Sequence, residues 1–169
     1  MSATRIARTA PQGRAHGALL RHSKVLIASR HERDTAMAVK KGVKQLVQEA
    51  NARITTVPVA EAIGLLDDPN VQFVDIRDVR ELEREGMVPG AFHAPRGMLE
   101  FWVDPDSPYF KPVFGEPKRF ILYCQSAWRS ALATAALQDM GLDNVAHVEG
   151  GFHGWKAAGG KVGQRPSNH

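Results

Sequence analysis

Apolar and polar positions alternate regularly along the chain from about residue 37 onward. Between residues 37 and 53 the apolar residues recur at helical spacing with lysine and glutamine between them, which predicts one amphipathic helix. A short β-type run follows at residues 54–57, and Pro58 can open a helix that extends to about Leu66. Residues 71–76 are typical of a buried strand.

The rest of the chain repeats this succession of strands and helices. Four prolines indicate that residues 104–117 form a loop. Further strands are predicted at residues 91–94, 119–123 and 145–148, and helical segments at 79–85, 97–103, 126–140 and 152–158. Strands that alternate with helices predict a parallel sheet covered on both faces, which is an α/β fold.

The first 36 residues lack this periodicity and carry most of the charge imbalance. They hold seven basic and two acidic residues, whereas the remainder has a net charge of −1. The composition resembles an organelle transit peptide. Because no cleavage site is defined, we favour a disordered tail or an upstream start codon, with Met37 as the true start. We therefore expect four parts: a basic, disordered extension (1–36), a lead-in helix (37–53), one domain (54–160) and a flexible tail (161–169).

Composition excludes several classes of protein. Hydrophobic residues make up 43% of the chain, enough for a core, but no apolar run is long enough to span a membrane. The net charge of +4 comes from the first 36 residues, so the folded part offers no basic face for nucleic acid. The single cysteine cannot form an internal disulfide and fits a reducing, cytoplasmic location. The seven histidines lack metal-ligand spacing, and we expect no metal or other cofactor.

The single cysteine, Cys124, has a position that suggests chemistry. It follows the strand at 119–123 and precedes a helix, and ligands of open α/β sheets bind at that end of the strands. Backbone N–H groups and the helix N-terminus should stabilise a thiolate there. Arg129 adds a permanent positive charge, and Ser126 and Ser130 can add hydroxyl donors. A small buried cysteine is the alternative, but the position favours a nucleophile.

Four segments, taken in order, resemble the motifs of single-domain rhodaneses, which are thiosulfate sulfurtransferase-like proteins. The segment at 124–132 resembles their active-site loop, and those at 73–81, 86–97 and 148–155 resemble their first, second and closing motifs. The resemblance extends from about residue 54 to residue 160. It implies the rhodanese fold, a five-stranded parallel sheet flanked by helices on both faces.

The resemblance also implies roles for individual residues. Cys124 would be the nucleophile, and Arg129 would bind the anionic donor or brace the loop. Asp75 and Arg77 would support the site from a neighbouring strand, and for Asp75 a structural hydrogen-bonding role is the better interpretation. The residues expected to contact the substrate, largely through backbone N–H groups, are Gln125, Ser126, Ala127, Trp128, Arg129 and Ser130.

Other polar and aromatic residues near these motifs carry weaker signals. Trp128 is large where the family often has small residues, so it is either a packing residue or an apolar lip over the sulfur. Glu81, Arg84 and Arg96 are expected to be solvated charges. No histidine is assigned a catalytic role, because an ionised thiol needs no general base.

The activity that the resemblance implies is transfer of a sulfane sulfur from thiosulfate or a similar donor to cyanide or a thiol, through a persulfide on Cys124. An alternative is a relay module that exchanges persulfide sulfur with a protein partner and has little activity on small molecules. The loop does not match that of mercaptopyruvate enzymes. A phosphatase or arsenate reductase is disfavoured because Cys124 and Arg129 enclose four residues, whereas the resemblance to those enzymes would require five.

Overall fold

The computed structural model describes residues 39–165. The predicted basic extension and the last four residues lie outside this range. From Lys41 on, the described residues belong to one compact unit. Within residues 39–165, no helix has both the length and the apolar character needed to cross a membrane.

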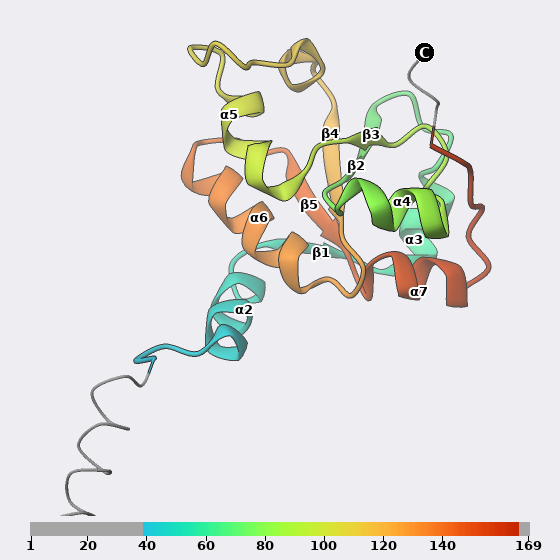
Figure 1. Cartoon of the computed structure of the whole chain (residues 1–169), viewed down its shortest axis with the longest axis horizontal. Coiled ribbons are helices and arrows are strands. Elements are labelled where there is room, and N and C mark those ends of the chain that lie inside the picture. Colours follow the sequence, from blue (N-terminus) through green and yellow to red (C-terminus); the bar gives the residue numbers. More distant parts are fainter. Residues whose placement is uncertain (1–38, 166–169) are drawn as a thin grey trace, which may run out of the picture. The chain divides into compact units, whose positions relative to one another are not determined.

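Five parallel strands form one sheet in the order β1-β5-β4-β2-β3, which confirms the predicted fold class (Figure 1). The strands are β1 (Thr55–Val57), β2 (Val71–Asp75), β3 (Phe92–His93), β4 (Arg119–Tyr123) and β5 (Val145–Val148). The helices are α2 (Val43–Asn51), α3 (Val59–Gly64), α4 (Val79–Glu85), α5 (Leu99–Val103), α6 (Trp128–Asp139) and α7 (Gly151–Ala157). Two short 3-10 turns are η1 (Arg96–Met98) and η2 (Pro112–Gly115).

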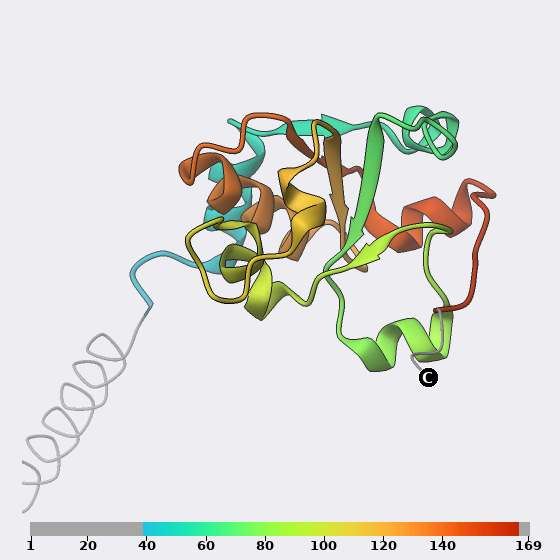
Figure 2. The same cartoon turned by 90° about the horizontal axis from the view of Figure 1, so that it is seen from above.

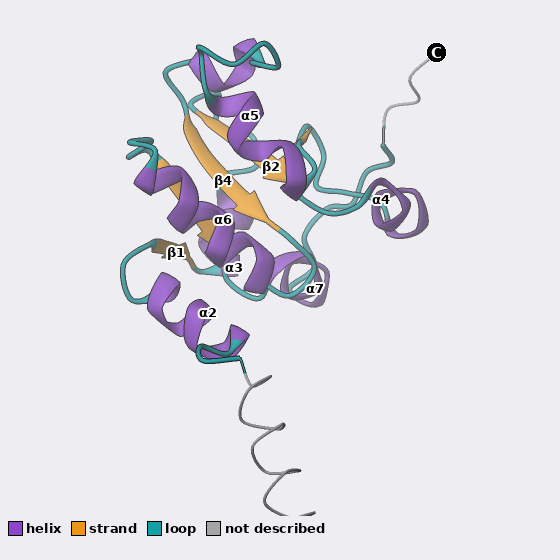
Figure 3. Ribbon diagram, turned by 60° about the vertical axis from the view of Figure 1, so that its left-hand side comes forward, coloured by secondary structure: helices purple, strands orange, loops and turns teal. Residues whose placement is uncertain are grey.

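Helices cover both faces of the sheet, which explains the nearly continuous apolar run of β4. Phe120 and Leu122 point to the face covered by α5 and α6, whereas Ile121 and Tyr123 point to the face covered by α3 and α7. Figures 2 and 3 show these two layers on either side of the strands. Helix α2 packs its buried residues against α6. The central strands β4 and β5 therefore bury residues on both faces, whereas Thr55 and Thr56 of the edge strand β1 are exposed.

Two helices begin later than predicted. The helix expected over residues 37–53 starts at Val43, and Val39, which is 80% exposed, lies outside it. Gly42 precedes this helix in an extended conformation, consistent with the poor helix propensity of glycine. The helix expected from residue 126 starts at Trp128, because Ala127 has a left-handed backbone with φ of 69°. Residues 37 and 38 lie outside the described range.

The first residues of the segment predicted to be a flexible tail contact the domain. Met87 and Gly163 exchange two backbone hydrogen bonds of 2.9 and 2.8 Å. The indole N–H of Trp155 donates to the carbonyl of Lys161 at 2.8 Å. These contacts attach the segment after α7 to the domain. The periodicity of apolar residues could not reveal these contacts. The pairing of Met87 with Gly163 joins residues far apart in the chain, and the acceptor for Trp155 is a backbone carbonyl, which any residue could supply.

Candidate active site

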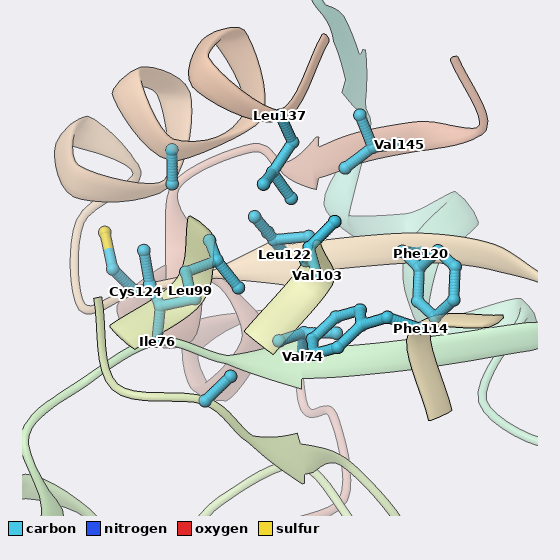
Figure 4. Close-up of a cluster of buried hydrophobic side chains, with 12 residues drawn as sticks. Val74, Ile76, Leu99, Val103, Phe114, Phe120, Leu122, Cys124, Leu137 and Val145 are labelled. Carbon is cyan, nitrogen blue, oxygen red and sulfur yellow. The ribbon is translucent and has the colours of Figure 1, made fainter. Parts of the chain in front are cut away.

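The candidate site lies at the carboxyl ends of β4 and β2. These strands are neighbours, and Asp75 at the end of β2 is in register with Tyr123 at the end of β4. The chain continues from β2 to β3 on one side of the sheet and from β4 to β5 on the other, so this is the point at which the strand order reverses. Cys124 follows β4 directly, at one end of the apolar cluster and near Ile76 and Leu99 (Figure 4).

Residues 124–129 form the cysteine loop, which connects β4 to the first turn of α6. The residue Cys124 is 1% exposed. The carbonyls of Cys124 and Gln125 accept hydrogen bonds of 2.8 and 3.0 Å from the N–H groups of Phe152 and His153. In the part of the chain that the structure describes, the backbone N–H groups of residues 125–129 are paired with no acceptor. Unpaired donors at a helix start are suited to binding an anion.

The close approach of the β5–α7 turn to this loop requires glycine at position 151. Gly151 has φ of +60°, and a Cβ atom there would lie 2.5 Å from the carbonyl oxygen of Cys124 and 2.8 Å from the nitrogen of Ala127. Both distances are shorter than any van der Waals contact. The absence of a side chain at Gly151 therefore allows the first turn of α7 to hold the loop carbonyls.

The predicted pair Asp75 and Arg77 is brought together beneath the loop. Both side chains are fully buried, and the guanidinium donates to both carboxylate oxygens, with a shortest distance of 2.7 Å. Arg77 also donates to the carbonyl of Gly86 at 2.7 Å and to the side-chain oxygen of Gln125 at 3.3 Å. Burial lowers the pKa of Arg77, but the Asp75 carboxylate outweighs it, so the pKa is raised and the guanidinium stays charged. The pair thus connects the end of β2 to the loop.

Arg129 forms a bidentate ion pair with Glu81 of α4, at 2.8 and 2.9 Å. Glu81 raises the pKa of Arg129, and the Cys124 thiol makes a smaller contribution in the same direction. Arg129 in turn lowers the pKa of Glu81. Glu81, expected to be a solvated charge, therefore has a specific partner, and it also completes the capping box of α4 with Asp78.

A second carboxylate on α4 contacts the other end of the loop. Glu85 accepts a hydrogen bond of 3.0 Å from the side-chain amide of Gln125 and forms ion pairs with Arg84 and Lys156. Arg84 and then Lys156 lower the pKa of Glu85 to about 2. Glu81 and Glu85 are four residues apart and so share one face of the helix. That spacing was the signal in the sequence that could have identified α4 as a support of the loop.

The remaining predicted residues lie at different depths. Trp128 is 47% exposed at the start of α6, so it is not a core packing residue. Ser126 is exposed, and Gln125 and Ala127 are half-buried. Ser130 is buried, with its hydroxyl 3.6 Å from the Cys124 sulfur. Whether these residues touch a substrate stays a prediction.

One buried histidine, a weak candidate in the sequence with no catalytic role assigned, reaches this region. His147 of β5 is 2% exposed, and its Nδ1 lies 3.3 Å from the Ser130 hydroxyl. Burial lowers the pKa of His147 to about 4, so the ring is neutral at neutral pH. On the other side of the site, the Nε2 atom of His93 lies 2.9 Å from the carbonyl of Arg77.

Comparisons with solved structures identify the fold at two levels of similarity. A protein of unknown function from Rhodopseudomonas palustris, described as a possible tyrosine phosphatase, is 51% identical, with a TM-score of 0.73 and coverage of 75% of this chain and 98% of its own. A thiosulfate sulfurtransferase from Pseudomonas aeruginosa is 23% identical, with a TM-score of 0.57, and covers 68% of this chain and 20% of its own. The second likeness concerns the fold alone.

Curated relatives are more distant and differ in their activities. The thiosulfate sulfurtransferase GlpE from Pseudoalteromonas translucida is 26% identical over 102 residues, or 60% of this chain and 89% of that protein. A tRNA uridine(34) hydroxylase from Erwinia tasmaniensis is 33% identical over 97 residues, or 55% of this chain. The match spans only 26% of the hydroxylase.

The family itself follows from a match to most of the folded region. The model of the rhodanese-like domain family matches residues 58–158, which lie within the predicted domain at 54–160. The match includes β2, β4, the cysteine loop and the turn before α7, which are the elements that build the site. This protein therefore belongs to the rhodanese-like domain family.

Proposed function

We propose that this protein transfers a sulfane sulfur through a persulfide on Cys124. The observation that carries the proposal is the set of unpaired backbone N–H groups at residues 125–129, which directly follow a cysteine at the end of β4. An anionic sulfur held there would accept hydrogen bonds from donors that are already in place. The sulfurtransferase names among the relatives agree with this chemistry.

The reaction has two displacement steps. The Cys124 thiolate attacks the outer sulfur of thiosulfate, a new S–S bond forms, and sulfite leaves with the electron pair of the broken S–S bond. The persulfide anion then waits in the loop. An acceptor, cyanide or a thiolate, attacks the terminal sulfur, and the Cys124 thiolate leaves with the electron pair. Neither step needs a metal or a redox cofactor.

A relay function with a protein partner is the second candidate, and the pairing of Arg129 favours it. Because Glu81 neutralises this guanidinium, a small dianionic donor gains less attraction from it than from a free arginine. A donor or acceptor protein would add contacts of its own outside the loop. In that case the reducing cytoplasm that we expect would supply thiol acceptors.

A phosphatase function deserves a separate test, because the neighbour that is 51% identical is described as a possible tyrosine phosphatase. The cysteine loop argues against it. A tetrahedral phosphate needs donors at about 2.7–3.2 Å from its oxygens around the sulfur. A loop with four residues between cysteine and arginine makes a smaller ring than one with five, so a single sulfur fits more readily than a phosphate.

The deciding experiment is the intact mass of the full chain after incubation with thiosulfate. We expect a gain of one sulfur atom that is lost on addition of cyanide and absent in Cys124→Ser, which should keep the same cooperative melt. Steady-state transfer to cyanide, measured beside transfer from a persulfidated protein, separates the enzyme from the relay module. If the protein instead hydrolysed an aryl phosphate in a Cys124-dependent reaction and gained no sulfur from thiosulfate, the protein would be a phosphatase and the proposal would be wrong.

A further inference from the structure

A line of polar side chains runs beneath α6 from the cysteine to the edge of the sheet. The Cys124 sulfur lies 3.6 Å from the Ser130 hydroxyl, which lies 3.3 Å from Nδ1 of His147. Nε2 of His147 lies 2.9 Å from the hydroxyl of Thr56 on β1. Thr56 and His147 are also register partners on neighbouring strands. The line thus begins at the buried sulfur and ends at an exposed threonine on the edge strand.

The positions of the protons on Ser130 and His147 determine whether the Cys124 sulfur receives a hydrogen bond. A thiolate or persulfide anion can only accept hydrogen bonds, and Ser130 has a single hydroxyl proton to give. If His147 carries its proton on Nδ1, that proton goes to the Ser130 oxygen, and the Ser130 proton is free to reach the sulfur. If the proton is on Nε2, Nδ1 is an acceptor and takes the Ser130 proton away from the sulfur.

The surroundings of His147 favour the first arrangement when the sulfur is anionic. The ring is buried and neutral, so it carries one proton. Thr56 can turn its exposed hydroxyl to donate to Nε2. The Ser130 hydroxyl also lies 3.1 Å from the carbonyl of Ala127, which competes with the sulfur for its proton. An anion attracts that proton more strongly than a neutral carbonyl does.

The groups that surround Ser130 and His147 are mostly apolar or uncharged. Leu122 of β4 is in register with His147, and Thr134 of α6 donates to the neighbouring carbonyl of Ala146 at 3.5 Å. Arg129, the charged side chain of the cysteine loop, is paired with Glu81. The Ser130 hydroxyl therefore reaches the sulfur from the interior side, whereas Arg129 and the loop N–H groups belong to the loop itself.

We propose that His147 is a positioning residue that directs the Ser130 hydroxyl toward the Cys124 sulfur and so stabilises the thiolate and the persulfide. The inference rests on the proposed function for the persulfide, but its effect on the thiolate can be measured without any sulfur donor. His147 does not touch the substrate and exchanges no proton with it. It acts by donating to Ser130.

The test is the rate of Cys124 alkylation by iodoacetamide as a function of pH, on the full chain. We expect the midpoint of the profile to move to higher pH by about one unit in His147→Leu, because a hydrogen bond to a charged group is lost. Ser130→Ala should move it by a similar amount, and the double variant should move it no further. His147→Asn, whose amide can donate to Ser130, should restore most of the difference.

Thr134→Val is the matched control, since it removes a buried hydroxyl from the same helix without touching the line to the sulfur. It should lower stability but leave the alkylation midpoint unchanged. An unchanged midpoint in His147→Leu, an equal shift in Thr134→Val, or additive shifts in the double variant would each overturn the inference. The His147→Leu variant could fail to fold. In that case the ¹⁵N chemical shifts of the His147 ring are measured in the unmodified protein, at a pH where Cys124 is ionised. A ring with its proton on Nε2 would also overturn the inference.

The two proposals fail separately. A Cys124 that never gains sulfur from thiosulfate or from a protein persulfide, while its alkylation still depends on His147, would reject the transferase and leave the role of His147 standing. Normal sulfur loading with an alkylation profile that ignores His147 would do the reverse.

Discussion

Two arginines at the site are each paired with a carboxylate of α4, but they differ in what else they contact. Arg129 contacts Glu81 and belongs to the cysteine loop, whereas Arg84 contacts the neighbouring Glu85 and is largely exposed. An exposed pair between adjacent residues contributes little to stability or positioning. At the residue scale, function should therefore depend on the position of the charge and not on the number of charges.

We expect Arg129→Ala to lower sulfur transfer by about tenfold or more, and Arg84→Ala by about twofold or less, because a bidentate pair fixes the loop and an exposed pair does not. Steady-state kinetics with thiosulfate and cyanide are the measurement. Equal losses in the two variants would contradict the assignment.

Glu81→Gln separates the two roles that Arg129 can have. If the pair braces the loop, the loss of the carboxylate should lower transfer as Arg129→Ala does. If Arg129 mainly binds the anionic donor, freeing its charge should lower the KM for thiosulfate instead. We expect the first outcome, since the ion pair is bidentate at 2.8 and 2.9 Å.

The buried His147 should make stability depend on pH. Its pKa falls from 6.5 to about 4 on folding, so the unfolded chain binds the extra proton first as the pH is lowered. The free energy of unfolding should therefore decrease between about pH 6.5 and pH 4, by up to about 3 kcal/mol. Asp78 and Glu85, with pKa values near 2, lose their contributions at lower pH.

Urea unfolding across this pH range measures the dependence, with His147→Asn as the control because asparagine does not titrate. Between pH 6.5 and 4, the free energy of unfolding should change less with pH in the variant than in the unmodified protein. The same pH dependence in both proteins would show that another group is responsible.

At the scale of elements, the site is made where three chain segments meet. The cysteine loop follows β4, α4 supplies two carboxylates to its side chains, and the turn before α7 donates to its carbonyls. The two glycines of that turn both have positive φ, but only Gly151 has backbone atoms of the loop within the space of a Cβ. The geometry of the loop therefore depends on a turn from a different strand.

We expect Gly151→Ala to cost about 1–3 kcal/mol more stability than Gly159→Ala, because it forces backbone atoms apart. Gly159 is the matched control, since it also has positive φ but has no atom within 4 Å of a Cβ position. Gly151→Ala should also slow the alkylation of Cys124. Denaturant unfolding and the alkylation rate test both points, and equal effects at the two glycines would refute the argument.

At the scale of the whole molecule, the two main clusters of the core lie on the two faces of one sheet. Together with the smaller cluster between α2 and α6, they draw on residues from Val47 to Trp155. The segment around Lys161 and Gly163 closes the domain through its contacts with Trp155 and Met87. All the described residues of these clusters lie in α2 or after it.

A chain that starts at Met37 should accordingly stay folded and active. Its thermal melt should remain cooperative, and its sulfur transfer should be similar to that of the full chain. A broad, non-cooperative melt would show that the first 36 residues have a structural role. A normal melt with lost transfer from a protein donor alone would indicate that they dock a partner.

The sequence by itself determined the succession of elements and the position of the nucleophile candidate. Buried strands could be read from the sequence because a strand buried on both faces has a continuous apolar run, as in β4, whose predicted and observed bounds agree. The bounds of β5 and α4 were also predicted correctly. These features are local, since each depends on residues a few positions apart.

Only the tertiary structure decided which distant residues meet at the sulfur. Glu81 and Arg129 are 48 positions apart, and Ser130 and His147 are 17 apart, so no periodicity relates them. Their contacts follow from the strand order, which puts β5 and β2 on either side of β4. The left-handed backbone of Ala127 is likewise held by its surroundings, because alanine has no local preference for it.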